Sequence, residues 1–159
     1  MAILFLVTLL MTLRAGSESD TDRIGRRLAA LLRAGDTVFL SGALGMGKTV
    51  LARGLIRALA GGEIEVPSPT FALIQQYATT PPVTHADLYR LEDPEEVMEL
   101  GLDEAAEAGI LIVEWAEHGE GYLPGGALSV TAREEPGARL WELAGDEDWA
   151  VRLSEKDFV

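Results

Sequence analysis

A glycine-rich stretch begins at Gly42 and ends at Thr49, and it limits the possible folds of this chain more than any other segment. It matches the pattern G-x-x-x-x-G-K-[ST], whose glycines let backbone N–H groups turn inward and cradle anionic phosphates. We expect Lys48 to place a positive charge between the β- and γ-phosphates, and Thr49 to ligate a phosphate-bound magnesium ion. The loop residues predicted to contact nucleotide are Gly42, Ala43, Leu44, Gly45, Met46, Gly47, Lys48 and Thr49.

The context of the loop fits this interpretation. Residues 37–41 predict a short strand before it, and residues 50–60 predict a helix after it that ends at Gly61. Lys48 is one of only two lysines among 13 cationic residues. Because arginine supplies the other cations, a lysine in this loop favours phosphate binding over a glycine-rich turn with a solvated side chain.

The rest of the chain adds strands and helices to this unit. Apolar runs and alternation predict five further strands, which cover residues 72–77, 83–89, 110–115, 126–132 and 138–144. The last two predict an antiparallel hairpin. Helices are predicted over residues 17–35, with Ser17 or Ser19 as the N-cap, and over residues 93–101, with Asp93 as the N-cap. The length of 159 residues and the lack of internal repeats indicate a single domain.

Residues 2–13 form an apolar run broken only by two threonines. Twelve residues are too few for a membrane span, which needs about 20. No cationic residue precedes the run, as a signal peptide would require, although small residues at 15–17 resemble a cleavage site. An extension of a chain that starts at Met11, a buried strand and a signal peptide remain open. We divide the chain into an apolar extension or strand over residues 1–13 and a phosphate-loop domain over residues 14–159.

A magnesium site beside a phosphate loop needs a carboxylate at the end of an adjacent buried strand. Glu114 ends the apolar run ILIVE, and Asp87 lies in VTHADLY, where alternation puts it on the same face as His85. Each acid is also compatible with a solvated strand end or a turn. His85 is more typical of a packed or hydrogen-bonded histidine than of a catalytic base.

Other residues are candidates for nucleotide contact. Thr70 follows Pro69 in a loop that is placed to sense the γ-phosphate, or that is simply a turn held rigid by Pro67 and Pro69. Trp115 directly follows Glu114, which is compatible with core packing as well as with a place in the site. Arg133 and Arg139 flank the turn of the predicted hairpin, and the sequence does not choose between them.

The composition of the chain limits the kinds of molecule that it can bind. The formal net charge is −13, which disfavours direct nucleic-acid binding and attachment to anionic membranes. Eight carboxylates between Glu92 and Glu107 predict either a solvated face or a surface that docks on a basic protein. The absence of cysteine excludes disulfides, thiolate zinc sites and cysteine nucleophiles.

In order, the motifs GALGMGKT, SPTFALIQQY, HADLYRL, ELGLDE and ILIVEWAE resemble the TsaE (YjeE) family of small bacterial ATPases over about residues 17–124. The resemblance implies a single α/β P-loop NTPase domain with a mostly parallel central sheet. It implies ATP and Mg²⁺ as ligands, with Thr49 and Glu114 on the metal. It also implies that Asp87 is the essential aspartate and that Trp115 is the tryptophan beside the metal-binding glutamate.

The same resemblance implies a cytoplasmic subunit that hydrolyses ATP in assembly with TsaD and TsaB during synthesis of threonylcarbamoyladenosine in tRNA. Two loop positions differ from the family pattern G-D-L-G-A-G-K-T, because this chain has Ala43 and Met46. Two alternatives stay open. One is a small-molecule kinase, although no arginine-rich lid follows Glu114; the other is a nucleotide-gated binding module with little hydrolysis.

Overall fold

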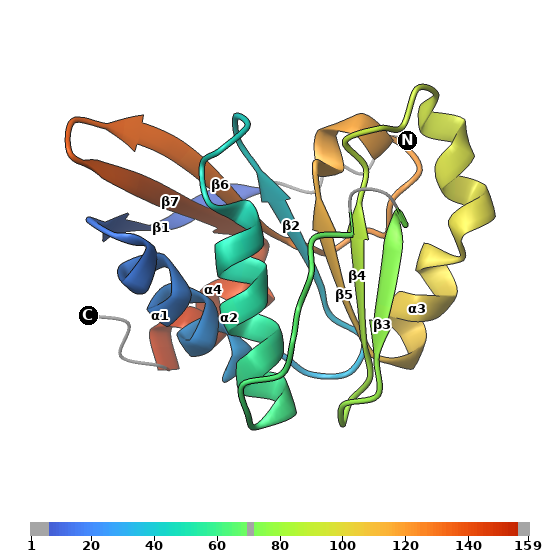
Figure 1. Cartoon of the computed structure of the whole chain (residues 1–159), viewed down its shortest axis with the longest axis horizontal. Helices are drawn as coiled ribbons and strands as arrows, with labels where there is room; N and C mark the ends of the chain where they lie inside the picture. Colours follow the sequence, from blue (N-terminus) through green and yellow to red (C-terminus); the bar gives the residue numbers. More distant parts are fainter. Residues whose placement is uncertain (1–6, 70–71, 156–159) are drawn as a thin grey trace.

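The protein is described by a computed structural model that covers residues 7–69 and 72–155. Its centre is a seven-stranded sheet with the order β1-β7-β6-β2-β5-β4-β3 (Figure 1). The strands are β1 (Thr8–Ala15), β2 (Thr37–Ser41), β3 (Ile74–Tyr77), β4 (Val83–Asp87), β5 (Ile110–Glu114), β6 (Leu128–Glu135) and β7 (Ala138–Gly145). The four inner strands β6, β2, β5 and β4 are parallel, which confirms the predicted fold class.

The outer strands pair antiparallel: β7 with β6, β1 with β7, and β3 with β4. The C-terminal hairpin is therefore present as predicted. It is also part of the main sheet, because β6 lies parallel to β2 beside the glycine-rich loop. Strand β1 closes the edge that β7 would otherwise expose.

The described part of the N-terminal apolar run, from residue 8 onward, is strand. β1 pairs with β7 from Thr8 opposite Gly145 to Ala15 opposite Arg139, with one irregularity near Met11. The predicted boundary after residue 13 falls inside this strand. Residues 1–6 lie outside the described part of the chain.

Helices cover both faces of the sheet. They are α1 (Glu18–Ala29), α2 (Lys48–Ala60), α3 (Leu102–Ala108), α4 (Glu147–Glu155) and two short 3-10 helices, η1 (Pro94–Leu100) and η2 (Ala116–Gly119). Helix α1 is capped by Ser17, whose hydroxyl oxygen accepts from the Asp20 N–H at 3.1 Å. In the described residues, none of these helices is long and apolar enough to cross a membrane.

Helices η1, α3, η2 and α4 differ from the sequence prediction, which had an α-helix over residues 93–101 and none at the other three places. Within the predicted α-helix over residues 93–101, Pro94–Leu100 form the 3-10 helix η1, and its three-residue period aligns Val97 and Leu100, which both pack in the core. Helix α4 was not predicted, because only Trp149 and Leu153 in it show an apolar spacing. Both side chains are buried against the main core.

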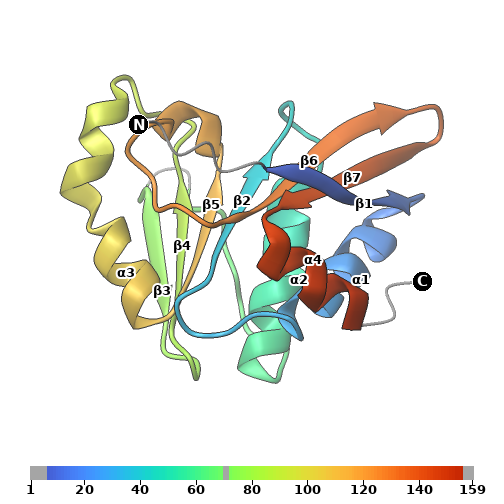
Figure 2. The same cartoon turned by 180° about the vertical axis from the view of Figure 1, so that it is seen from behind.

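The sheet separates two apolar cores. The larger lies between the sheet and helices α1, α2 and α4, and the smaller lies on the side of α3, η1 and η2 (Figure 2). In β5, Ile110 and Ile112 face the larger core, while Leu111 and Val113 face the smaller one. Alternation then turns Glu114 toward the side of α2, where the glycine-rich loop ends.

Candidate functional site

The glycine-rich loop joins the end of β2 to the start of α2. Its glycines adopt positive φ, with 127° at Gly42 and 98° at Gly47. A Cβ at Gly42 would lie 2.9 Å from the carbonyl oxygen of Ala132 on β6, so close approach and backbone conformation both require glycine there. Gly47 is the N-cap of α2 and provides no side-chain cap. The first-turn N–H groups of α2 therefore face outward as an anion site.

Lys48 is buried at the base of this loop, with 5% of its surface exposed. Its ammonium donates to the carbonyl oxygens of Gly42 and Ala43, the latter at 2.9 Å, and lies 3.9 Å from the ring centroid of Trp115. Burial lowers the pKa of Lys48 below its usual value, while nearby carboxylates act in the opposite direction. The Lys48 side chain is thus held in place by carbonyl oxygens of the glycine-rich loop.

Thr49 and Glu114 meet across the end of the sheet. The Thr49 hydroxyl donates to Oε1 of Glu114 at 2.8 Å, and the Glu114 side chain is 2% exposed. The contact follows from topology, because β5 is the parallel neighbour of β2 and Glu114 stands opposite Leu40 in the register. The structure therefore brings the two predicted metal ligands together.

His85 occupies the other side of the same carboxylate. Its Nε2 lies 2.6 Å from Oε2 of Glu114, and the ring is completely buried. His85 reaches Glu114 because β4 and β5 are adjacent, with His85 opposite Ile112. The two oxygens of Glu114 are thus shared between Thr49 and His85.

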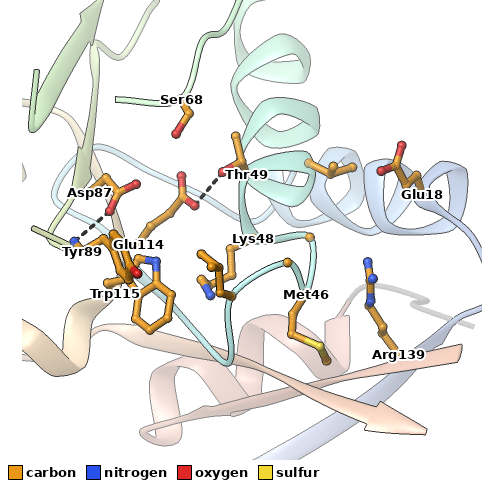
Figure 3. A pocket seen from close by; sticks show the side chains of 14 residues that line it. Glu18, Met46, Lys48, Thr49, Ser68, Asp87, Tyr89, Glu114, Trp115 and Arg139 are labelled. Carbon is orange, nitrogen blue, oxygen red and sulfur yellow. Dashed lines mark hydrogen bonds between the residues drawn. The ribbon is translucent and has the colours of Figure 1, made fainter. Parts of the chain in front are cut away.

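Asp87 ends β4 directly opposite Glu114. It is 3% exposed, and one carboxylate oxygen accepts from the N–H of Tyr89 at 2.9 Å. Asp87 and Glu114 line one cavity with the loop (Figure 3). The predicted pair of carboxylates therefore lies at one edge of the parallel sheet.

An aromatic cluster borders this edge. Tyr89 lies 4.9 Å from Trp115 between ring centroids, and His118 lies 5.3 Å from Trp115. Trp115 has φ 58°, so the chain turns sharply after Glu114 and the indole turns back over Lys48. The sequence did not predict that Tyr89 and His118 lie in this aromatic cluster.

The cavity has a volume of about 400 Å³ and contains most, not all, of the predicted residues. It is lined by loop residues 44–49, by Asp87, Glu114 and Trp115, and by the unpredicted Glu18, Ser68 and Tyr89 (Figure 3). Gly42 and Ala43 do not line the cavity; their carbonyl oxygens instead accept hydrogen bonds from the ammonium of Lys48. Thr70 lies outside the described residues.

The structure also distinguishes the two hairpin arginines. Arg139 on β7 lines the cavity, and a Cβ at Gly47 would lie 3.3 Å from its Nη1 (Figure 3). Arg133 points away, is 63% exposed and pairs with Glu142 at 2.6 Å. Sequence spacing carried no signal for this choice, because it depends on how the hairpin sits beside the loop.

The side chains of the site fit a magnesium-bound nucleotide. Cationic Lys48 and Arg139 and the uncapped start of α2 suit phosphates, and the oxygens of Thr49 and Glu114 suit a hard cation. Within residues 7–69 and 72–155, no group of three or more His, Asp or Glu side chains is placed to hold a metal ion. Two protein oxygens are what magnesium uses when phosphates and water supply the rest.

Comparisons with known proteins agree with this geometry. Residues 15–140 match the family model described as Threonylcarbamoyl adenosine biosynthesis protein TsaE. The chain is 39% identical over 118 residues to the tRNA threonylcarbamoyladenosine biosynthesis protein TsaE of Rickettsia bellii, which covers 74% of this chain and 82% of that protein. A protein of the same name from Streptomyces coelicolor is 47% identical over 98 residues, or 59% of this chain and 66% of that protein.

A solved structure gives the same picture. The structure described as "Crystal structure of Bacillus subtilus YdiB" matches with a TM-score of 0.77 and 29% identity, and the match covers 94% of both chains. The likeness therefore extends over nearly the whole of both chains.

Proposed function

This chain belongs to the TsaE family of threonylcarbamoyl adenosine biosynthesis proteins, and we propose on that premise that it binds Mg-ATP and hydrolyses it in assembly with TsaD and TsaB. The observation that carries the proposal is the contact between Thr49 and Glu114 at the mouth of the glycine-rich loop. It sets two oxygen ligands beside an anion site, which is the arrangement that a metal-bound triphosphate requires.

The residues of the site have distinct roles in this proposal. The loop amides and Lys48 hold the phosphates, and Arg139 approaches them from β7. Thr49 and Glu114 hold magnesium, which neutralises charge that develops on the phosphates. Asp87, one strand away from Glu114, orients or deprotonates the attacking water.

The surface charge supports work in a protein assembly. The net charge is −13, and the carboxylates between Glu92 and Glu107 are all exposed on η1, α3 and the flanking residues. This acidic face suits a basic protein surface better than tRNA. We therefore assign tRNA contact to the partners, and tight, salt-sensitive binding of naked tRNA by the isolated chain would contradict that assignment.

The decisive experiment measures ATP hydrolysis by the chain alone and with the TsaB–TsaD pair. We expect a low rate alone that rises when the pair is added. An Asp87→Ala preparation, purified in parallel, controls for contaminating ATPases. A rate indifferent to the pair would contradict the assembly, and phosphorylated product in a screen of small acceptors would replace hydrolysis by a kinase reaction.

A further inference from the structure

The carboxylate of Glu114 is held from two sides. Its Oε1 accepts from the Thr49 hydroxyl at 2.8 Å, and its Oε2 lies 2.6 Å from Nε2 of His85. Both contacts are shielded, because the exposed fraction of the side chain is 0% for His85 and 2% for Glu114. Oε1 of the carboxylate lies beside Thr49, which lines the cavity. Oε2 lies beside His85, which is buried in the protein interior.

The surroundings of the imidazole determine where its proton lies. Within the described residues, Nδ1 of His85 has no hydrogen-bond partner and is buried. A proton on Nδ1 would be a buried donor without an acceptor, which folded proteins avoid. A proton on Nε2 instead makes a charge-assisted hydrogen bond to Glu114. The contacts therefore favour a ring that carries a proton on Nε2.

His118 has the opposite arrangement. Its Nδ1 lies 2.9 Å from the carbonyl oxygen of Leu88, which can only accept. His118 therefore carries a proton on Nδ1. Because the chain has only these two histidines, the two rings form an internal comparison in one spectrum.

We propose that His85 is a positioning residue for the metal-binding carboxylate. By donating from Nε2 to Oε2, it fixes the rotation of Glu114 so that Oε1 is presented to Thr49 at the cavity, where the two residues would hold magnesium. The inference rests on the proposed function, since it concerns the same site. A metal-binding carboxylate is commonly held in this way by a neighbouring hydrogen bond, and loss of such a neighbour lowers metal affinity or activity by about 10–100-fold.

The first test locates the histidine protons by nitrogen-15 NMR of the full chain, without nucleotide. We expect one ring protonated at Nε2 and the other at Nδ1, and the Nε2-protonated signals disappear in His85→Gln. A His85 ring protonated at Nδ1 alone would overturn the proposal, whatever the protein binds.

The second test measures how ADP binding, followed by calorimetry, depends on Mg²⁺ concentration. His85→Phe keeps a ring but loses the donor, and His85→Gln keeps an N–H that reaches the position of Nε2. We expect the half-saturating Mg²⁺ concentration to rise about 10-fold or more in His85→Phe and to stay within about threefold of wild type in His85→Gln. Binding of ADP without Mg²⁺ should change little in either variant.

Thr84→Val is the matched control. Thr84 is the preceding residue on β4, is also buried, and stands opposite Leu111 on the other face of the sheet. We expect it to leave the Mg²⁺ dependence unchanged. An equal shift in Thr84→Val and His85→Phe would show a general defect of β4, and equal shifts in Gln and Phe variants would show that the ring only packs. Either result overturns the proposal.

The outcomes separate this inference from the function on which it rests. A wild-type chain that binds no Mg-nucleotide contradicts both the proposed function and the effect of His85 on metal binding. The NMR result on the proton of His85 does not depend on nucleotide or metal binding. A wild-type chain that binds Mg-ADP, with His85→Phe indistinguishable from it, contradicts the role of His85 only.

Discussion

The ammonium of Lys48 lies over the indole of Trp115, with Nζ 3.9 Å from the ring centroid. The same group donates to two carbonyls of its own loop. Phosphates would compete for this cation, so the nucleotide and the indole share one partner. Nucleotide binding at the loop should therefore change the fluorescence of Trp115.

We predict that ADP changes the intrinsic fluorescence of the chain and that Trp115 is the source. The change should be absent in Trp115→Phe and retained in Trp149→Phe, because Trp149 is a buried residue of α4 whose indole donates to the carbonyl oxygen of Gly126, away from the cavity. Fluorescence titration of the three proteins tests this. A full response in Trp115→Phe would contradict the prediction and assign the signal to another tryptophan, such as Trp141 beside Gly47.

Substitutions of Lys48 and Asp87 should affect different steps, ATP binding for Lys48 and ATP turnover for Asp87. Lys48→Ala removes the buried cation beside the loop and should abolish tight ATP binding. Asp87→Ala should bind ATP near the wild-type affinity and lose about 100-fold or more of partner-stimulated turnover, as expected for loss of a group that handles the proton. Calorimetry and a phosphate-release assay measure the two effects, and normal turnover by Asp87→Ala would refute the role of Asp87.

Nucleotide affinity should fall at alkaline pH. Burial lowers the pKa of Lys48 in the nucleotide-free chain, and bound phosphates would raise it again. Affinity is then highest while Lys48 is protonated and declines as pH rises through the lowered pKa. ADP titrations carried from neutral pH up to the ordinary pKa of lysine, about 10.4, should show this decline, while Lys48→Arg, which stays charged, should bind less tightly but with a flat profile. A flat wild-type profile would contradict the prediction.

Arg139 should contribute to nucleotide affinity, and Arg133 should not. Arg139 lines the cavity, whereas Arg133 is exposed and paired with Glu142. A charge-assisted contact to phosphate contributes about 1.5–3 kcal/mol, so Arg139→Ala should weaken ADP binding by roughly 10-fold or more. Arg133→Ala on the same hairpin is the matched control in the same titration. Equal affinities of both variants would remove Arg139 from the site.

Arg152 should stabilise the fold without affecting the site. It makes two hydrogen bonds to Asp36, at 2.6 and 3.1 Å, and both side chains are largely buried. Arg152→Ala leaves the Asp36 carboxylate buried without this partner and should cost about 3–5 kcal/mol of unfolding free energy. Arg133→Ala, which breaks an exposed pair, should cost at most about 1 kcal/mol. Denaturant unfolding compares the two, and equal losses would contradict the distinction.

The local parts of this protein could be predicted from its residue pattern. The motif from Gly42 to Thr49 predicted the loop between β2 and α2, and the run that ends at Glu114 predicted β5. Alternation around His85 and Asp87 placed both on one face of β4. These features are local, because glycine conformation, strand alternation and helix capping depend on neighbouring residues.

Which side chains meet depends on the order and register of the strands. Local pattern does not specify strand order or register, so it did not show that His85 and Thr49 share the carboxylate of Glu114. It did not choose Arg139 over Arg133, or reveal that Trp115 turns back over Lys48. Each of these contacts joins segments far apart in the chain. They exist because burial of the two cores sets the order of the strands, and that order is a property of the whole sheet.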